Sequence, residues 1–203
     1  RLDSNGNCQW AEMFITPYVF DITVDKYNCT YITGVVMGQG TFGTHTVLSH
    51  GGQDIYLAKC NSNGTWAWVV SAGSTDFDQG LGVTADKYGH IYFTGYFTTT
   101  ATFGTNILTT SVGASDIFTA CYNDQGNCLW VKQAGGGHGN HYSCGITTDI
   151  HGNCIITGDV SDTAHFDNCT FIADAENAFI AKYDSIGNCK WVTGSKGNSG
   201  QRG

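Results

Sequence analysis

One short phrase recurs along the chain at a nearly constant interval, and it constrains the fold more than any other feature. It ends in tryptophan and reads NGNCQW at 5–10, NGTWAW at 63–68, QGNCLW at 125–130 and IGNCKW at 186–191. The four tryptophans, 58, 62 and 61 residues apart, are Trp10, Trp68, Trp130 and Trp191. Self-similarity at a fixed period indicates tandem structural units, and a large aromatic residue in each unit predicts a repeated core.

Further phrases keep the same order and spacing. One reads ITVDKYNCTYITG at 22–34, VTADKYGHIYFTG at 83–95 and ITTDIHGNCIITG at 146–158. It is followed by GTFGT at 40–44, ATFGT at 101–105 and the diverged AHFDN at 164–168. Several phrases in one order, three times over, exclude a chance recurrence.

Each unit contains four runs typical of strands. In the second unit they are LGVTAD, HIYFTGYF, DIFTACY and CLWVKQA, rich in β-branched and aromatic residues. Turn-forming segments separate them, namely DKYG, TTTATFGTN and NDQG. We therefore expect an all-β fold, a β-propeller-like tandem repeat of four-stranded antiparallel blades. It has three full units of about 61 residues and a stray N-terminal strand.

The phrases also set the expected boundaries. Residues 1–14 are predicted to form the outer strand of a preceding or shared blade, and 15–73, 74–135 and 136–203 the three blades of one propeller-like domain. Because three blades do not close a propeller, we expect the chain to be part of a longer protein or of an assembly. Neighbouring repeats, or other copies of the chain, would then pair through exposed strand edges.

The run DIFTACYNDQGNCLWVKQAGG, followed by GITTDIHGNCIITG and TATFG, resembles the SBBP-type bacterial β-propeller repeat. The likeness spans essentially the whole chain. The resemblance implies a secreted or surface-exposed bacterial protein, and it brings no catalytic motif. The chain departs from the repeat pattern in its cysteine content and in Asp167, where the pattern has glycine.

Composition excludes some partners. The chain has nine Lys and Arg residues and a net charge of −8. Because nucleic acids and anionic membranes bind basic surfaces, this composition argues against either as a partner. No apolar run reaches the roughly 18 residues of a membrane span. Nine cysteines without a CxxC pair favour an oxidising, extracellular location over a zinc ribbon.

Candidate covalent modifications follow from the cysteines and sequons. Cys121 and Cys128 flank one predicted hairpin, so they form either a cross-strand disulfide or two buried thiols. Sequons at Asn28, Asn63 and Asn168 are possible glycosylation sites, although two or three are expected by chance in this composition.

Two segments raise the question of a metal. His138, His141 and Cys144 lie at three-residue spacing in a glycine-rich segment, where a plain loop is favoured over a zinc or copper site. The DSNGN segment at 3–7 resembles part of a calcium loop but aligns with hairpin turns and is predicted to be one. We therefore predict neither a metal nor another cofactor.

The sequence offers no catalytic motif either. No GxSxG occurs, and the remaining histidines, such as His50 and His90, lack a fixed Ser or Asp partner in the pattern. Asp25, Asp86 and Asp149 recur before a turn in every unit, so they are predicted to cap those turns. The chain is therefore not expected to be an enzyme.

Two functions fit these observations. The first is a non-enzymatic extracellular structural or adhesive repeat protein, one form of which is a filament-forming subunit. The alternative is a glycan- or protein-binding propeller module, with aromatic residues such as Phe77, Tyr96 or Tyr142 stacking on a sugar.

Overall fold

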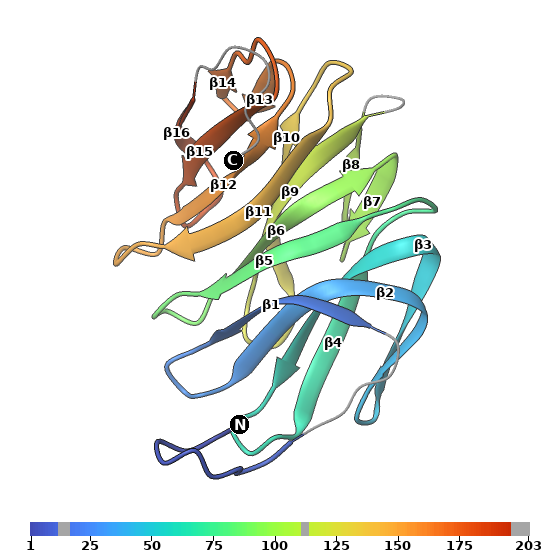
Figure 1. Cartoon of the computed structure of the whole chain (residues 1–203), viewed down its shortest axis with the longest axis vertical. Coiled ribbons are helices and arrows are strands. Elements are labelled where there is room, and N and C mark those ends of the chain that lie inside the picture. Colours follow the sequence, from blue (N-terminus) through green and yellow to red (C-terminus); the bar gives the residue numbers. More distant parts are fainter. Residues whose placement is uncertain (12–16, 111–113, 196–203) are drawn as a thin grey trace.

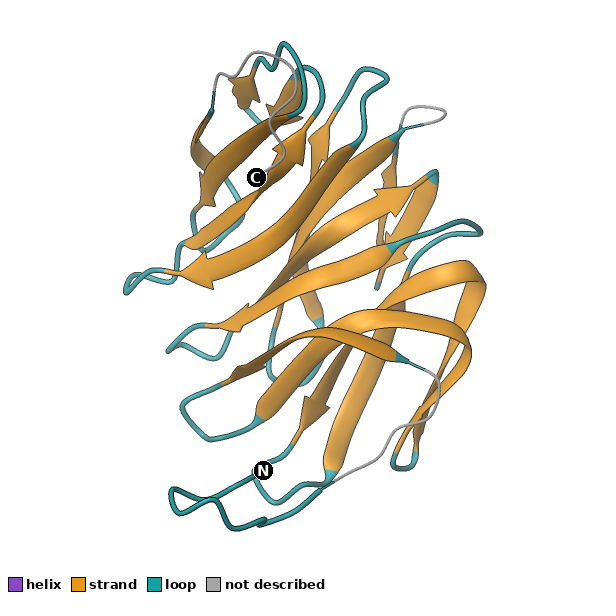
Figure 2. Ribbon diagram, viewed as in Figure 1, coloured by secondary structure: helices purple, strands orange, loops and turns teal. Residues whose placement is uncertain are grey.

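The computed structural model describes residues 1–11, 17–110 and 114–195, and its regular structure consists of strands β1 to β16. Two antiparallel sheets of four strands and one of six form most of the molecule, which confirms the predicted all-β class (Figures 1 and 2). The predicted outer strand at 1–14 lies partly outside the described residues. Between Arg1 and Trp10 the structure has one isolated bridge, from Leu2 to Cys8.

Each sheet is built from consecutive segments of the chain. The first holds β1 (Tyr18–Val24), β2 (Thr30–Phe42), β3 (His45–Cys60) and β4 (Trp66–Ala72). The second is built on β5 (Gln79–Ala85), β6 (Ile91–Thr98), β9 (Ser115–Tyr122) and β10 (Cys128–Gly135), and two strands of a later hairpin extend it to six strands. The third holds β11 (His141–Thr148), β12 (Cys154–Val160), β15 (Asn177–Tyr183) and β16 (Cys189–Gly194). We call these sheets, with the turns that join their strands, the first, second and third units.

The segment TTTATFGTN forms a hairpin and not the simple turn that its composition predicts. Its strands are β7 (Thr100–Phe103) and β8 (Asn106–Thr109). The equivalent segment extends β2 and β3 in the first unit, and forms β13 (Ala164–Phe166) and β14 (Cys169–Phe171) in the third. β13 pairs with β10, so the hairpin of the third unit extends the sheet of the second.

Asp167 shows how the hairpin tolerates the loss of glycine. Its φ is +57°, close to the +58° of Gly43 and +62° of Gly104 at the equivalent positions. Asp is one of the few residue types that enter this left-handed region readily. Its carboxylate also lies 2.7 Å from Nζ of Lys132 on β10, which ties the hairpin to the preceding unit.

The units pack face to face and share their cores. One cluster joins Ile55 and Leu57 of β3 to Val83 of β5, and another joins Cys121 of β9 to Ile156 of β12. The first strands of the units are neighbours, because β5 lies between β1 and β11 (Figure 1). Each unit therefore buries apolar surface that it could not bury alone.

No helix in the described part of the chain has the length and apolar character needed to cross a membrane.

Candidate functional site: the contact between units

The recurring tryptophan makes the same contact with the following unit three times. Its indole nitrogen donates a hydrogen bond to a backbone carbonyl in the next outer turn. The pairs are Trp10 with Ser62 at 3.2 Å, Trp68 with Asp124 at 2.9 Å and Trp130 with Ser185 at 3.0 Å. Each tryptophan thus binds the turn between the third and fourth strands of the next unit.

The turn glycine allows the indole to lie against the backbone. Gly64, Gly126 and Gly187 have φ values of +92°, +83° and +86°, a region that favours glycine. A Cβ atom at these positions would lie 2.9, 3.0 and 2.9 Å from the facing indole ring. Two separate reasons therefore require glycine at each of these positions: the positive φ of the turn and the close approach of the indole ring.

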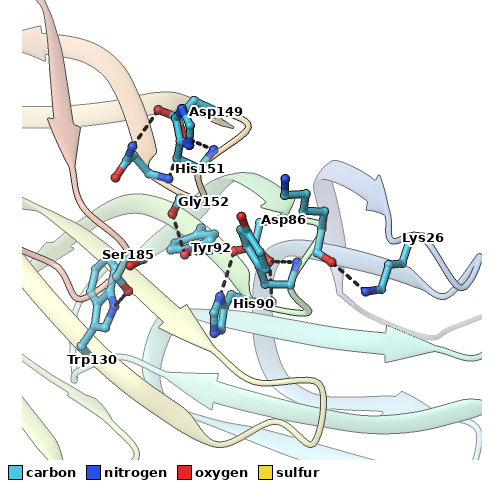
Figure 3. A network of polar contacts seen from close by, with 12 residues as sticks. Lys26, Asp86, His90, Tyr92, Trp130, Asp149, His151, Gly152 and Ser185 are labelled. Atoms are coloured by element: carbon cyan, nitrogen blue, oxygen red, sulfur yellow. Dashed lines mark hydrogen bonds and ion pairs between the residues drawn. The ribbon is translucent and has the colours of Figure 1, made fainter.

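A second set of contacts joins the units nearer their first strands (Figure 3). The hydroxyl of Tyr92 on β6 donates to the Gly152 carbonyl of the third unit at 3.0 Å. Nζ of Lys26 donates to the Lys87 carbonyl of the second unit at 2.7 Å. In both contacts a side chain of one unit donates a hydrogen bond to a backbone carbonyl of the next, as the tryptophans do.

The recurring aspartates cap their turns as predicted. Oδ1 of Asp25 accepts hydrogen bonds from the backbone nitrogens of Tyr27 and Cys29, at 2.8 and 2.9 Å. Asp86 and Asp149 make the same pair of bonds in the second and third units. Hydrogen bonds from Asn153 and Lys182 hold the pKa of Asp149 below its ordinary value of 3.8.

Two histidines have carboxylate partners, contrary to the prediction that they lack one. Nδ1 of His90 lies 2.8 Å from Asp86, and Nδ1 of His50 lies 3.1 Å from Asp54. Each partner is four residues away, a spacing that the sequence shows. The hydroxyl oxygen of Tyr92 also lies 3.3 Å from Asp86, so this carboxylate lies beside both its own turn and a contact between units (Figure 3).

Buried carboxylates between the units were not singled out from the sequence. Asp78 is buried and accepts hydrogen bonds from the backbone nitrogens of Ser74 and Thr98, at 2.6 and 2.8 Å. Asp116 is buried and accepts a hydrogen bond from Gln133. Desolvation raises the pKa of both carboxyls above the ordinary value.

The structure does not bring the histidine-rich loop together as a metal site. His138 and Cys144 are exposed, whereas His141 is buried with Nε2 2.9 Å from the Gly136 carbonyl and 3.2 Å from Asp162. Within residues 1–11, 17–110 and 114–195, no group of three or more His, Cys, Asp or Glu is placed to hold a metal. The DSNGN segment forms a hairpin turn, in which Asp3 accepts from the backbone nitrogens of Asn5 and Asn7.

Of the two alternatives for Cys121 and Cys128, the disulfide is not formed, since both residues are free thiols. A bulge sets Cys128 opposite Tyr122 and Trp130 opposite Cys121, so the two thiols reach different core clusters. The alternative was two buried thiols, and Cys121 is buried whereas Cys128 is half-buried.

The disulfide present joins Cys169 on β14 to Cys189 on β16. The second unit has Asn106 and Cys128 at the corresponding places, where Nδ2 lies 3.6 Å from Sγ. The hairpin is therefore fastened to the fourth strand in both units, by a covalent bond in one and by a polar contact in the other.

The predicted surface residues are partly available for contact. The sequon residues Asn28, Asn63 and Asn168 are all exposed, and their glycosylation stays a prediction. Phe77 is 58% exposed. Tyr96 and Tyr142 pack edge to face with ring centroids 4.8 Å apart, so each covers part of the other.

The surfaces that form the contact between units are uncovered at both ends of the array. Trp191 is 42% exposed, unlike a core residue. Gly6 has the turn conformation, with φ at +82°, but a Cβ there would meet nothing within 4 Å. On the first strand, Ile22 is 61% exposed, whereas Val83, its equivalent in the second unit, is 4% exposed.

No protein-family model matches this chain, and the search of curated proteins found no significant match.

Proposed function

We propose that this chain is a non-enzymatic structural repeat protein of the cell exterior, whose units are β-propeller-like blades and which self-associates through their open faces. One observation carries the proposal. The same apolar position is buried where two units meet, as Val83, and exposed where no unit covers it, as Ile22. Val24, two residues further along β1 and 54% exposed, extends that exposed face. Contiguous exposed apolar surface of this kind marks a protein–protein contact.

The neighbouring arrangement of β1, β5 and β11 supports the propeller class, since the first strands of propeller blades surround a common axis. The resemblance to SBBP-type repeats points to the same class. The Cys169–Cys189 disulfide favours an extracellular location, because disulfides persist in oxidising compartments.

The polar groups of the molecule support a structural role over a catalytic one. Asp86, His90 and Tyr92 hold a turn and a unit contact through their hydrogen bonds. Asp149 is likewise engaged by its own turn and by Lys182, at 2.8 Å. The groups that most resemble catalytic residues thus have defined partners within the fold.

The test is the molar mass of the purified chain over a wide concentration range, measured by light scattering, with negative-stain electron microscopy of the particles. We expect the mass to rise with concentration and the particles to be rings or fibres. Ile22→Glu should weaken the association, because it places a charge on the open face. Ile107→Glu, an equally exposed position on β8, is the matched control. A wild-type chain that stays monomeric throughout contradicts the proposal.

A second candidate function is binding of glycans through the exposed ring of Phe77. Sugar rings stack on exposed aromatic faces, and this side chain offers one. A glycan array would reveal it, and binding should be lost in Phe77→Ala. An array without hits contradicts this candidate and leaves the structural one standing.

A further inference from the structure

Trp191 is the unused half of a contact that the molecule makes three times. The preceding tryptophan of the series, Trp130, binds the Ser185 carbonyl and lies against Gly187. Trp191 occupies the corresponding place on β16, where it lies opposite Lys182. Among the residues that the structure describes, the Trp191 indole nitrogen has no acceptor. Trp191 therefore presents a ring face and a hydrogen-bond donor.

The turn at residues 3–7 is the matching unused half. Its sequence, DSNGN, differs at one position from DSIGN at 184–188, which Trp130 covers. The two turns also fold alike. Asp3 accepts from the backbone nitrogens of its second and fourth following residues at 2.9 and 2.8 Å, and Asp184 does so at 3.2 and 2.9 Å. The turn at 3–7 thus offers Trp191 the surface that Trp130 already binds.

The backbone atoms that a tryptophan needs are accessible in this turn. Gly6 has φ at +82°, against +86° for Gly187, and the space above it is open. Ser4 is exposed and corresponds to Ser185, the residue whose carbonyl accepts the indole hydrogen bond.

Resting on the proposed self-association, we propose that Trp191 of one copy packs on Gly6 of a second copy and donates its indole N–H to the Ser4 carbonyl. The occupant is a second copy because this chain carries the required turn, uncovered and with almost the sequence that Trp130 binds. Trp191 and Gly6 lie at opposite ends of the array, so each copy keeps one of them free after the first contact. Such a heterologous contact continues from copy to copy, and yields a ring if it closes or a filament if it does not.

Two variants block the two halves separately. Trp191→Ala removes the indole. Gly6→Asn keeps the left-handed turn, which Asn tolerates, and places a side chain where the ring would lie. Ile172→Ala is the matched control, since Ile172 is a highly exposed apolar residue of the same unit. Circular dichroism should show that all three variants keep the wild-type fold.

Sedimentation velocity over a range of concentrations gives the readout. Trp191→Ala and Gly6→Asn should each weaken self-association on the order of 30-fold or more, as expected for a central aromatic anchor. Ile172→Ala should associate like the wild type. An equimolar mixture of the two blocked variants should form a dimer and no larger species, because one intact Trp191 then meets one intact Gly6.

The outcomes separate this contact from the proposed function. If the wild type associates and both blocked variants associate equally well, the contact is wrong and self-association uses another surface, such as β1. If each blocked variant is monomeric and their mixture stays monomeric, the pairing of Trp191 with Gly6 is wrong. If the wild type itself is monomeric, the proposed function is wrong as well, and Trp191 does not bind a second copy of the chain.

Discussion

Alanine at Gly187 should destabilise the protein more than alanine at Gly89, and the difference measures the packing of Trp130 on the turn. Both glycines have positive φ, +86° and +96°, so alanine strains both turns. Only at Gly187 would the new Cβ approach an indole, to 2.9 Å from Trp130, whereas it would meet nothing within 4 Å at Gly89.

The magnitudes follow from these two effects. The left-handed conformation costs an alanine about 1–2 kcal/mol at either position. Overpacking against the indole adds about 1–3 kcal/mol at Gly187 alone. In a chain of this length each kcal/mol lowers the melting midpoint by roughly 2–4 °C, so Gly187→Ala should melt at least about 2 °C below Gly89→Ala.

Urea unfolding followed by circular dichroism gives the free energies of unfolding of both variants. The same pair of substitutions in a Trp130→Val background supplies the control, because without the indole only the flexible end of Lys132, 3.1 Å from the new Cβ, remains close to it, and the two losses should become nearly equal. Equal destabilisation of the two variants in the wild-type background would refute the packing of Trp130 on this turn.

Three further outcomes are expected. A thiol reagent should label exposed Cys144 in the native protein but reach Cys121 only after unfolding, because burial raises the pKa of the Cys121 thiol to about 12; equal native rates contradict this. Cys189→Ser should lose about 3 kcal/mol of unfolding free energy by opening the loop to Cys169, a loss that reductant should reproduce in the wild type. Asp116 has a raised pKa, so its folded form keeps a proton that the unfolded chain releases above pH 3.8, and stability falls as pH rises through that window. Asp116→Asn should remove this fall, so that the slope of unfolding free energy against pH becomes more positive above pH 3.8, and an unchanged slope contradicts the assignment.

Local features of the fold were predictable because each repeated phrase carries them in full. The aspartate caps at Asp25, Asp86 and Asp149 depend on residues within four positions, and they form as predicted. Only the residue types of the contact between units were predictable, and their partners were not. Every phrase shows glycine four residues before tryptophan, but the sequence does not say that the indole of one phrase covers the glycine of the next.

The cysteine pairing was not predictable because it depends on register. A symmetric hairpin would place Cys121 and Cys128 on one face, but the bulge between Cys128 and Trp130 shifts the register. A one-residue shift moves a side chain to the opposite face of the sheet. The pair Cys169 and Cys189 depends on a hairpin that the composition of its segment had indicated to be only a turn.

The indole of one unit contacts backbone atoms of the next, so this contact depends little on the side chains of the turn that it covers. Trp10, Trp68 and Trp130 each pack on a glycine and donate to a backbone carbonyl, which a serine supplies in two cases and an aspartate in one. Removing the 62 residues after Trp68 would set that indole over the turn of Gly187, which has the same shape. Recombination between repeats can therefore lengthen or shorten the encoded array by whole units while the indole contact is kept at the new junction.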